Sequence, residues 1–181
     1  MKEINIPWSM PVALADVPNT GQHFDLAADE DTRAKLAKLA GVRVLPKLEA
    51  SFDVERHGAS GLHVSGHVAA TVGQICVVTL EPLDNEVEEN VDLTFAPPRE
   101  PVADMDDDDG VTGAAALDTI EPLIDERIDL GAIATEFLLL GVDPYPRKPG
   151  VQFKPASVGD AEAHPFAALA ALKKDRDAKD D

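Results

Sequence analysis

The only cysteine of the chain, Cys76, has the most reactive side chain in the sequence. It could serve as a nucleophile or a redox thiol if neighbouring positive charge lowered its pKa. Its sequence neighbours, Ile75 and the pair Val77-Val78, are apolar, and no basic residue stands near it. Because free cysteines are among the most frequently buried residues, we predict a structural role for Cys76. One cysteine also excludes an intramolecular disulfide.

Histidines are the next candidates, since they could bind a metal or transfer a proton. His57, His63 and His67 stand close together in the sequence. If His63 and His67 share a strand, they lie about 13 Å apart. A zinc ion with bonds of about 2 Å cannot bridge that distance. His23 and His164 are isolated and give no signal, so we expect solvated histidines rather than a metal site.

Two groups of acidic residues could also do chemistry, and both have a simpler explanation. Asp106 to Asp109 lack the spaced ligands and closing glutamate of a calcium-binding loop. We expect a mobile acidic loop over residues 99–116, because dense like charge cannot offset the entropy of ordering. Glu86, Glu88 and Asp92 alternate with apolar residues, which indicates the solvated face of a strand. We therefore expect neither catalytic residues nor a metal or other cofactor.

Basic residues form one cluster that would suit a phosphate group. Within fifteen positions stand Arg33, Lys35, Lys38, Arg43 and Lys47, and no acidic residue lies between residues 34 and 47. Such a patch could bind RNA, although a helix displaying ordinary solvated lysines explains the same pattern. Arg147 and Lys148 are a second candidate. The prolines around them stiffen a segment that could contact a partner or merely end a helix.

The overall charge limits how these residues could be used. The 181 residues include 16 Lys and Arg and 34 Asp and Glu, a formal net charge of −18. An acidic chain repels nucleic acid over most of its surface, so any RNA contact needs a local basic patch. One Trp and one Tyr offer little for stacking on bare bases. The sequence shows no secretory signal and no apolar run of the ~20 residues that span a bilayer, so we expect a cytoplasmic protein.

One stretch of alternating residues organises the expected sheet. Its two runs, Leu62–Val72 and Val87–Phe95, have the two-residue period of strands with one dry face. Between them the β-branched run Cys76–Leu80 predicts a further short strand, and Glu81–Asn85 predicts a turn. Glu89 interrupts the apolar positions of the second run, which predicts a bulge or a strand end there.

The remaining elements are expected to surround this sheet. A strand region over Val42–Val54 precedes the first run, joined to it by a hairpin loop over Arg56–Gly61. Helix signals occur over residues 31–40, ending at Gly41, over 130–140 after Asp129, and over 165–173. A short strand is expected within residues 117–128, an edge strand over 4–8, and irregular structure over 10–20.

These elements predict an α+β fold. Its sheet is expected to be antiparallel, to have about five to seven strands and to be either open or barrel-like, with two or three helices packed on one side. We expect one domain over residues 1–172, and a charged flexible tail over residues 173–181.

The sequence around Cys76 resembles the YceD family, the large ribosomal RNA subunit accumulation proteins. The likeness is carried, in the family's order, by Gln74–Pro82 with the acidic strand 87–95, Ile128–Gly131, Glu136–Leu140, Pro144–Gly150 and Pro165–Leu169. The later motifs are similar to the form found in alphaproteobacteria. Many relatives carry Cys-x-x-Cys where this chain has Cys76-Val77-Val78-Thr79, which speaks against a zinc or dithiol role. Cys76, Glu81 and Pro82 are then a structural motif.

The resemblance implies a non-enzymatic role in the synthesis, processing or accumulation of the large-subunit (23S) ribosomal RNA. The expected partner is that RNA or a basic ribosomal protein. For the ribosomal protein, opposite charges would speed its association with this acidic chain. No membrane and no small-molecule substrate is expected. The alternative is an acidic, chaperone-like interaction module for basic clients.

Overall fold

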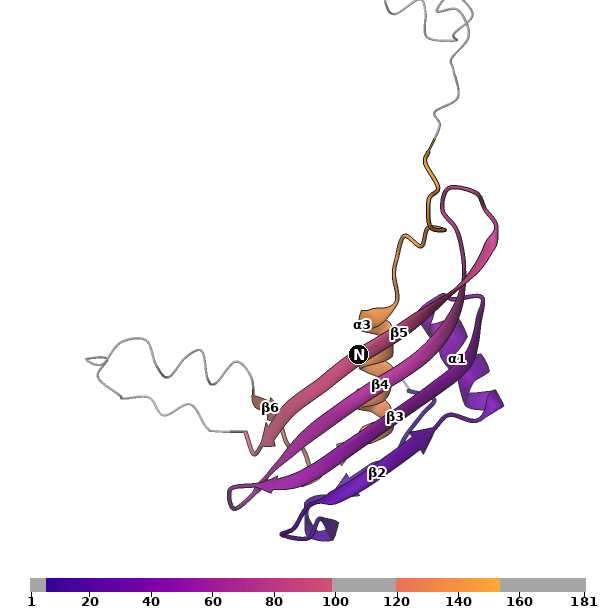
Figure 1. The fold of residues 1–181 in the computed structure, drawn as a ribbon. Coiled ribbons are helices and arrows are strands. Elements are labelled where there is room, and N and C mark those ends of the chain that lie inside the picture. Colours follow the sequence, from indigo (N-terminus) through magenta and orange to yellow (C-terminus); the bar gives the residue numbers. More distant parts are fainter. Residues whose placement is uncertain (1–5, 99–119, 154–181) are drawn as a thin grey trace, which may run out of the picture. The chain divides into compact units, whose positions relative to one another are not determined.

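The computed structural model describes residues 6–98 and 120–153. Its main layer is a five-stranded sheet in the order β2-β3-β4-β5-β6 (Figure 1). The strands are β2 (Gln22–Ala27), β3 (Val44–His57), β4 (Gly61–Ile75), β5 (Pro82–Ala96) and β6 (Ile120–Pro122). A second, two-stranded sheet pairs β1 (Pro11–Ala13) with β7 (Arg127–Asp129), and the short 3-10 helix η1 (Leu14–Asp16) follows β1.

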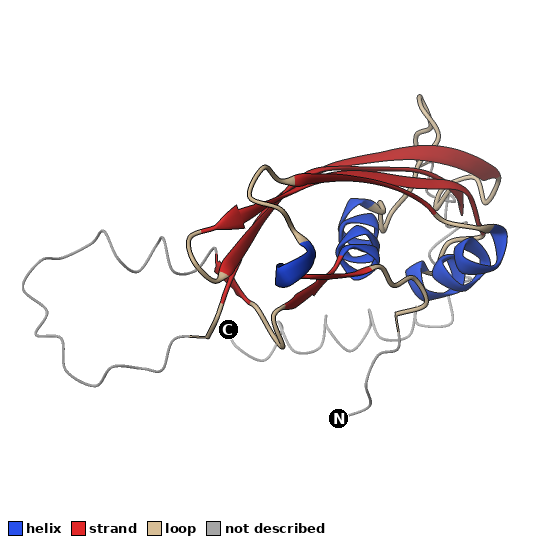
Figure 2. Ribbon diagram, turned by 90° about the horizontal axis from the view of Figure 1, so that it is seen from below, coloured by secondary structure: helices blue, strands red, loops and turns tan. Residues whose placement is uncertain are grey.

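Two α-helices lie against one face of the main sheet. They are α1 (Glu30–Ala40) and α3 (Leu130–Gly141). Figure 2 shows the sheet as one curved layer with the helices and the small sheet on its concave side. The α+β fold with two packed helices is therefore confirmed.

Alternation along the long strands places the core between this sheet and the helices. On β3, Leu48, Phe52 and Val54 are at most 1% exposed, and the inward residues of β4 are equally buried. Leu138 and Ala134 of α3 close the core from the other side, with no exposed surface. The two-residue period of the sequence thus becomes a dry face and a wet face of the sheet.

Short side chains fix where each helix begins. Asp29 accepts a hydrogen bond from the Thr32 amide (2.7 Å) at the start of α1, and Gly41, with φ 67°, ends that helix in the left-handed region. Asp129 accepts from the Ala132 amide (3.0 Å) at the start of α3. Both helices are where the sequence predicts them.

Asp129 also fastens the start of the described chain to α3. Its carboxylate accepts hydrogen bonds from the Ser9 hydroxyl (2.5 Å) and the Met10 amide (2.8 Å). The Leu130 amide donates in turn to the Met10 carbonyl (3.0 Å). One carboxylate therefore caps a helix and holds the segment that leads into β1.

The connection between β4 and β5 differs from the prediction. Cys76–Leu80 is not a strand but the hairpin loop, and Glu81–Asn85 is not a turn, because β5 begins at Pro82. The Leu80 amide donates to the Cys76 carbonyl (2.9 Å), and Leu80 takes a positive φ of 59° to close the loop. The β-branched residues of this run favour a strand. The chain must reverse within these few residues to pair β4 with β5, and this requirement determines the loop conformation.

The predicted bulge at Glu89 is also wrong. The β4–β5 register runs without interruption from Leu62 opposite Phe95 to Ile75 opposite Pro82. Glu89 stays on the helix-facing side, half-buried, where Gly141 of α3 approaches it closely. The pairing is instead irregular in β3, between Val44 and Lys47, a span that contains Pro46.

Four further features depart from the sequence expectation. β1 forms within residues 10–20, which were expected to be irregular, and β2 was missed because Leu26 is its only buried residue. β6 runs parallel to β5, so the sheet is mixed rather than purely antiparallel. Trp8, within the expected edge strand over 4–8, lies outside any strand.

The sheet ends at β2 and β6 and is therefore open. Of the two forms that the sequence allowed, an open sheet and a barrel-like one, the structure has the open one.

The chain divides into two compact units, residues 1–149 and 150–181. All elements described above belong to the first unit, and residues 150–153 are the described part of the second. The expected acidic loop over 99–116, the helix over 165–173 and the tail over 173–181 lie outside the described residues. The single domain expected over residues 1–172 stays a prediction.

Phe52 and Phe24 test how strongly the core depends on the dry face of β3. The two residues stand opposite each other in the β2–β3 register, but Phe52 is fully buried and Phe24 only partly. Phe52→Ala should lower the free energy of unfolding by about 3–5 kcal/mol, measured by urea denaturation. Phe24→Ala, the matched control, should lower it by less, and equal losses would contradict this account of the core.

Candidate functional site

Three of the five clustered basic residues line one groove. Arg33 and Lys38 of α1 and Arg43, just before β3, border a hollow of about 430 Å³. Its floor includes the apolar residues Val42 and Leu45. Lys35 and Lys47 are exposed but do not line it. We call the hollow the α1–β3 groove.

The turn after α1 brings these side chains together. Gly41 reverses the chain, and the Val42 amide donates back to the Ala37 carbonyl (3.0 Å). The Arg43 amide then donates to the Gly73 carbonyl of β4 (2.8 Å), which ties this turn to the sheet. Arg43, which follows this turn, therefore lines the same groove as Lys38 of α1.

The cations of the cluster differ in how fully they are engaged. Arg33 donates from its guanidinium to the Ala28 carbonyl (2.6 Å), so it is fixed in place. Arg43 stands 3.8 Å from the Asp84 carboxylate, in a half-exposed pair. Lys38 and Lys35 make no ion pair with any described residue. The groove thus holds one fixed cation, one loosely paired cation and one whose charge faces solvent.

Lys47 forms an ion pair within its own strand and does not line the groove. Its ammonium lies 2.9 Å from Glu49 on the same strand. The hydrogen bond that Lys47 donates to Glu49, followed by the attraction of the Glu49 charge, raises the pKa of Lys47. Because this carboxylate cancels its charge locally, Lys47 is the weakest of the five candidates for a phosphate.

The second predicted pair, Arg147 and Lys148, lies beside the β4–β5 hairpin loop. The Val77 amide donates to the Pro146 carbonyl (2.9 Å), and Lys148 places its ammonium 2.7 Å from Glu81. That ammonium lowers the pKa of the Glu81 carboxyl. Arg147 is exposed and makes no ion pair in the described part of the chain. Lys148 therefore holds the loop in place, while Arg147 is exposed to solvent.

Cys76 lies at the centre of this junction. It has no exposed surface, and its sulfur accepts hydrogen bonds from the amides of Thr79 (3.4 Å) and Lys148 (3.5 Å). The Thr79 side chain, the Lys148 amide and the other loop amides lower the pKa of the Cys76 thiol to about 6, against the opposing effect of burial. The sulfur joins the hairpin loop to the segment after α3, and its burial denies access to a substrate.

The two predicted basic patches lie toward the same end of the sheet. Arg43 reaches Asp84 near the start of β5, and Lys148 reaches Glu81 just before it. Figure 1 shows α1 and the β4–β5 loop at this same end. Sequence reasoning treated the two patches separately, because they are about a hundred residues apart along the chain.

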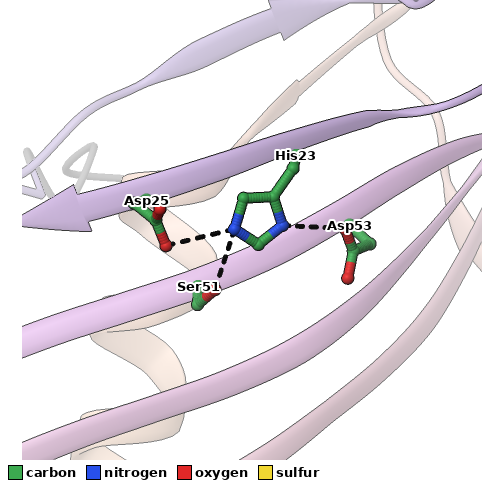
Figure 3. A network of polar contacts seen from close by, with 4 residues as sticks. All are labelled: His23, Asp25, Ser51 and Asp53. Carbon is green, nitrogen blue, oxygen red and sulfur yellow. Dashed lines mark hydrogen bonds and ion pairs between the residues drawn. The ribbon is translucent and has the colours of Figure 1, made fainter.

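One polar network was missed in the sequence. His23 of β2 lies with Nδ1 2.8 Å from Asp53 and Nε2 3.2 Å from Asp25, and Ser51 lies 3.3 Å from the same Nε2 (Figure 3). Hydrogen bonds in which Asp53 and then Asp25 accept from the ring raise the pKa of His23. The Ser51 hydroxyl, followed by His23, lowers the pKa of Asp25. The β2–β3 register, with His23 opposite Asp53, creates the network.

Serine, histidine and aspartate in contact also occur in nucleophilic hydrolases, where the histidine takes the serine proton. Here both ring nitrogens of His23 lie within hydrogen-bond distance of carboxylates, and Nε2, the nitrogen near Ser51, is shared with Asp25. Hydrogen bonds to both carboxylates favour the protonated form of the ring, whereas a general base must be unprotonated. The network, half-exposed on the outer face of the sheet, therefore acts as an ion-pair link between β2 and β3.

The sequence contained a weak signal for this network. His23 and Asp25 are two positions apart, as are Ser51 and Asp53, so each pair would lie on one face of a strand. β2 had to be recognised before the four residues could be placed together. His63 is paired with Asp92 (2.9 Å) on the same outer face. Among residues 6–98 and 120–153, no group of three or more His, Cys, Asp or Glu is arranged to hold a metal ion.

A second hollow, of about 500 Å³, lies beside α3 and is mainly apolar. Its lining includes Phe95 at the end of β5 and Ile133 and Leu139 of α3. Its polar lining residues are Arg127, Asp129, Thr135 and Glu136.

No helix in the described residues is both long and apolar enough to cross a membrane.

Comparison with known proteins gave one match. Residues 64–173, more than half of the chain, match the family model described as large ribosomal RNA subunit accumulation protein YceD. The matched region runs from β4 through β5 and α3 to the segment that carries Arg147 and Lys148. Neither the curated proteins nor the solved structures yielded a match.

The His23 network predicts a pH-dependent contribution to stability. Because the folded-state pKa of His23 is raised above its ordinary 6.5, its contribution is fully present below pH 6.5 and is lost as pH rises through the folded pKa. His23→Ala should therefore destabilise the protein clearly at pH 5.5 and hardly at all at pH 9, measured by urea denaturation. The facing groups are Asp25, Asp53, Ser51 and, from β4, His67.

The matched control is His57→Ala, which removes an exposed histidine that makes no ion pair with a described residue. It should have the same small effect at both pH values. If His23→Ala destabilised the protein equally at pH 5.5 and pH 9, the loss would come from packing and not from the ion pairs.

Proposed function

The chain belongs to the YceD family of large ribosomal RNA subunit accumulation proteins, and from this we propose that it is a non-enzymatic ribosome-biogenesis factor. In this role it supports the synthesis, processing or stability of the large-subunit ribosomal RNA. That role places it in the cytoplasm. The contact we propose is between the RNA backbone and the α1–β3 groove together with Arg147.

The observation that carries this proposal is the gathering of cations at one end of the sheet. Arg33, Lys38 and Arg43 share the groove, and Arg147 lies at the hairpin loop of the same end. RNA binding by a chain of net charge −18 requires such a local concentration of positive charge. Arginine and lysine bind phosphate oxygens through charge-assisted hydrogen bonds.

The state of the reactive groups supports a role without catalysis. Cys76 is buried within a structural junction, and both ring nitrogens of His23 are engaged with carboxylates. The buried sulfur has no access to a substrate, and Asp25 competes with Ser51 for the same nitrogen of His23. A factor that acts by docking needs neither.

The acidic face of β5 favours a second candidate function, the binding of a basic protein. Asp84, Glu86, Glu88 and Asp92 lie on the outer side of this strand. Such a row would attract a basic ribosomal protein, or basic clients in general if the chain acts like a chaperone. This function is compatible with the first, because the acidic row and the groove involve different side chains.

Charge reversal in the groove tests the RNA contact. The double variant Lys38→Glu/Arg43→Glu should weaken binding to large-subunit ribosomal RNA by about tenfold or more at moderate salt. It should also reduce the slope of log affinity against log salt by about one to two, since two phosphate contacts are lost. In cells that depend on the variant, the ratio of large- to small-subunit ribosomal RNA should fall.

The control is Arg127→Glu/Lys47→Glu, with the same change of charge outside the groove. Arg127 is exposed on β7, and Lys47 is already paired with Glu49. It should keep RNA affinity and salt slope close to those of the unaltered protein. If both double variants weakened binding equally, net charge rather than the groove would govern the interaction.

A further inference from the structure

One edge of β5 lacks a neighbouring strand over most of its length. β4 pairs with β5 from Pro82 to Phe95, whereas β6 pairs only with Thr94 to Ala96 on the other side. Among the described residues, no strand lies beside residues 83–93 on that side. This open stretch spans about 33 Å at ~3.3 Å per residue.

The register determines which backbone groups face outward. The Cys76 amide donates to the Glu81 carbonyl (2.9 Å), so Cys76 and Glu81 form a hydrogen-bonded pair in the same register as β4 and β5. Such pairs alternate along an antiparallel ladder. Odd-numbered residues of β5 then bond to β4, and the amides and carbonyls of the even-numbered residues Asp84, Glu86, Glu88, Asn90 and Asp92 face away from it. Pro82, which has no amide hydrogen to offer, fits this parity.

The same residues make the edge acidic. Their side chains lie on the outer face of the sheet, and four of the five are Asp or Glu. Asp84, Glu86 and Asp92 contact Arg43, Thr71 and His63 respectively. Glu88 has neither an ion pair nor a side-chain hydrogen bond with a described residue. It lies at the middle of the open edge, between Glu86 and Asn90 on the outer face.

We propose that this edge binds an extended basic peptide segment as an added antiparallel or parallel strand. Backbone hydrogen bonds from the outward amides and carbonyls supply the affinity. Lys or Arg at alternate positions of the segment would have Cβ atoms about 4.5–5.5 Å from those of the acidic residues of β5, close enough for their side chains to form ion pairs. These pairs would select a basic sequence. The proposal adds a binding mode to the proposed function, and the natural segment would be a basic extension of a ribosomal protein.

Charge decides against a second copy of this chain as the occupant. Two β5 edges paired with each other would place rows of carboxylates side by side, and like charges directly opposite are destabilising. A basic segment meets the same row with opposite charge. The acidic edge therefore hinders self-association while remaining open to a cationic strand.

The test uses the full chain and a ten-residue peptide in which lysine alternates with threonine and valine. Glu88→Pro removes one outward amide, and an edge strand tolerates proline where the amide faces solvent. Glu88→Ala removes the same charge but keeps the amide. Relative to Glu88→Ala, Glu88→Pro should weaken peptide binding by about tenfold or more in calorimetric titration. Circular dichroism checks that both variants keep the sheet.

Hydrogen exchange gives an independent measurement. The amides of Glu86, Glu88 and Asn90 should exchange quickly in the free protein and become protected when the peptide binds. A composition-matched peptide with all its lysines at one end should bind more weakly and protect them less.

Three outcomes would overturn the proposal. Equal weakening by Glu88→Pro and Glu88→Ala would show simple charge attraction without an added strand. Failure of the alternating peptide to bind would remove the site, and protection of these amides in the free chain would show that the edge is already covered. RNA binding by the groove is measured separately, so loss of the edge site leaves that proposal standing, and loss of RNA binding leaves this one.

Discussion

The pairing of β4 with both of its neighbours is the interaction on which the rest of the structure depends. β4 is held along its length by β3 on one side and β5 on the other, in a continuous register with β5. Gly66 shows how close this pairing is. A β-carbon there would collide with the Ser51 carbonyl and would lie 2.9 Å from the Phe52 α-carbon. Absence of a side chain at Gly66 therefore lets the fully buried Phe52 ring pack in the core.

That register also determines where the functional groups stand. It turns the chain at Cys76–Leu80, so the cysteine sulfur, Glu81 and the segment around Lys148 meet at the loop. Gln74, at the end of β4, donates to the Asp143 carbonyl and accepts from Asn85, which joins the segment after α3 to the hairpin. Arg43 is tied to the same end through Gly73. The candidate site is thus assembled from three distant parts of the chain, which are held together by contacts with the β4–β5 hairpin.

Charge is separated in space on this molecule. Cations collect in the α1–β3 groove and at Arg147, whereas the outer row of β5 is acidic. Contacts such as Arg43 with Asp84 and Lys148 with Glu81 mark the boundary between the two regions. Exposed pairs of this kind contribute little to stability, so their main effect is to orient side chains. The arrangement would let one protein hold RNA and a basic protein at neighbouring surfaces, as the two proposals require.

The sequence by itself determined the elements whose signals are local. The alternation of Leu62–Val72, the caps Asp29 and Asp129, and the stop at Gly41 depend on residues a few positions apart, so β4, α1 and α3 could be predicted. Only the tertiary structure decided features that depend on distant pairing. These include the partners of His23, the joining of Lys148 to Glu81 and the open edge of β5. β2 and the loop at Cys76–Leu80 were mispredicted because their local composition is weak or misleading, and long-range backbone hydrogen bonds override such preferences.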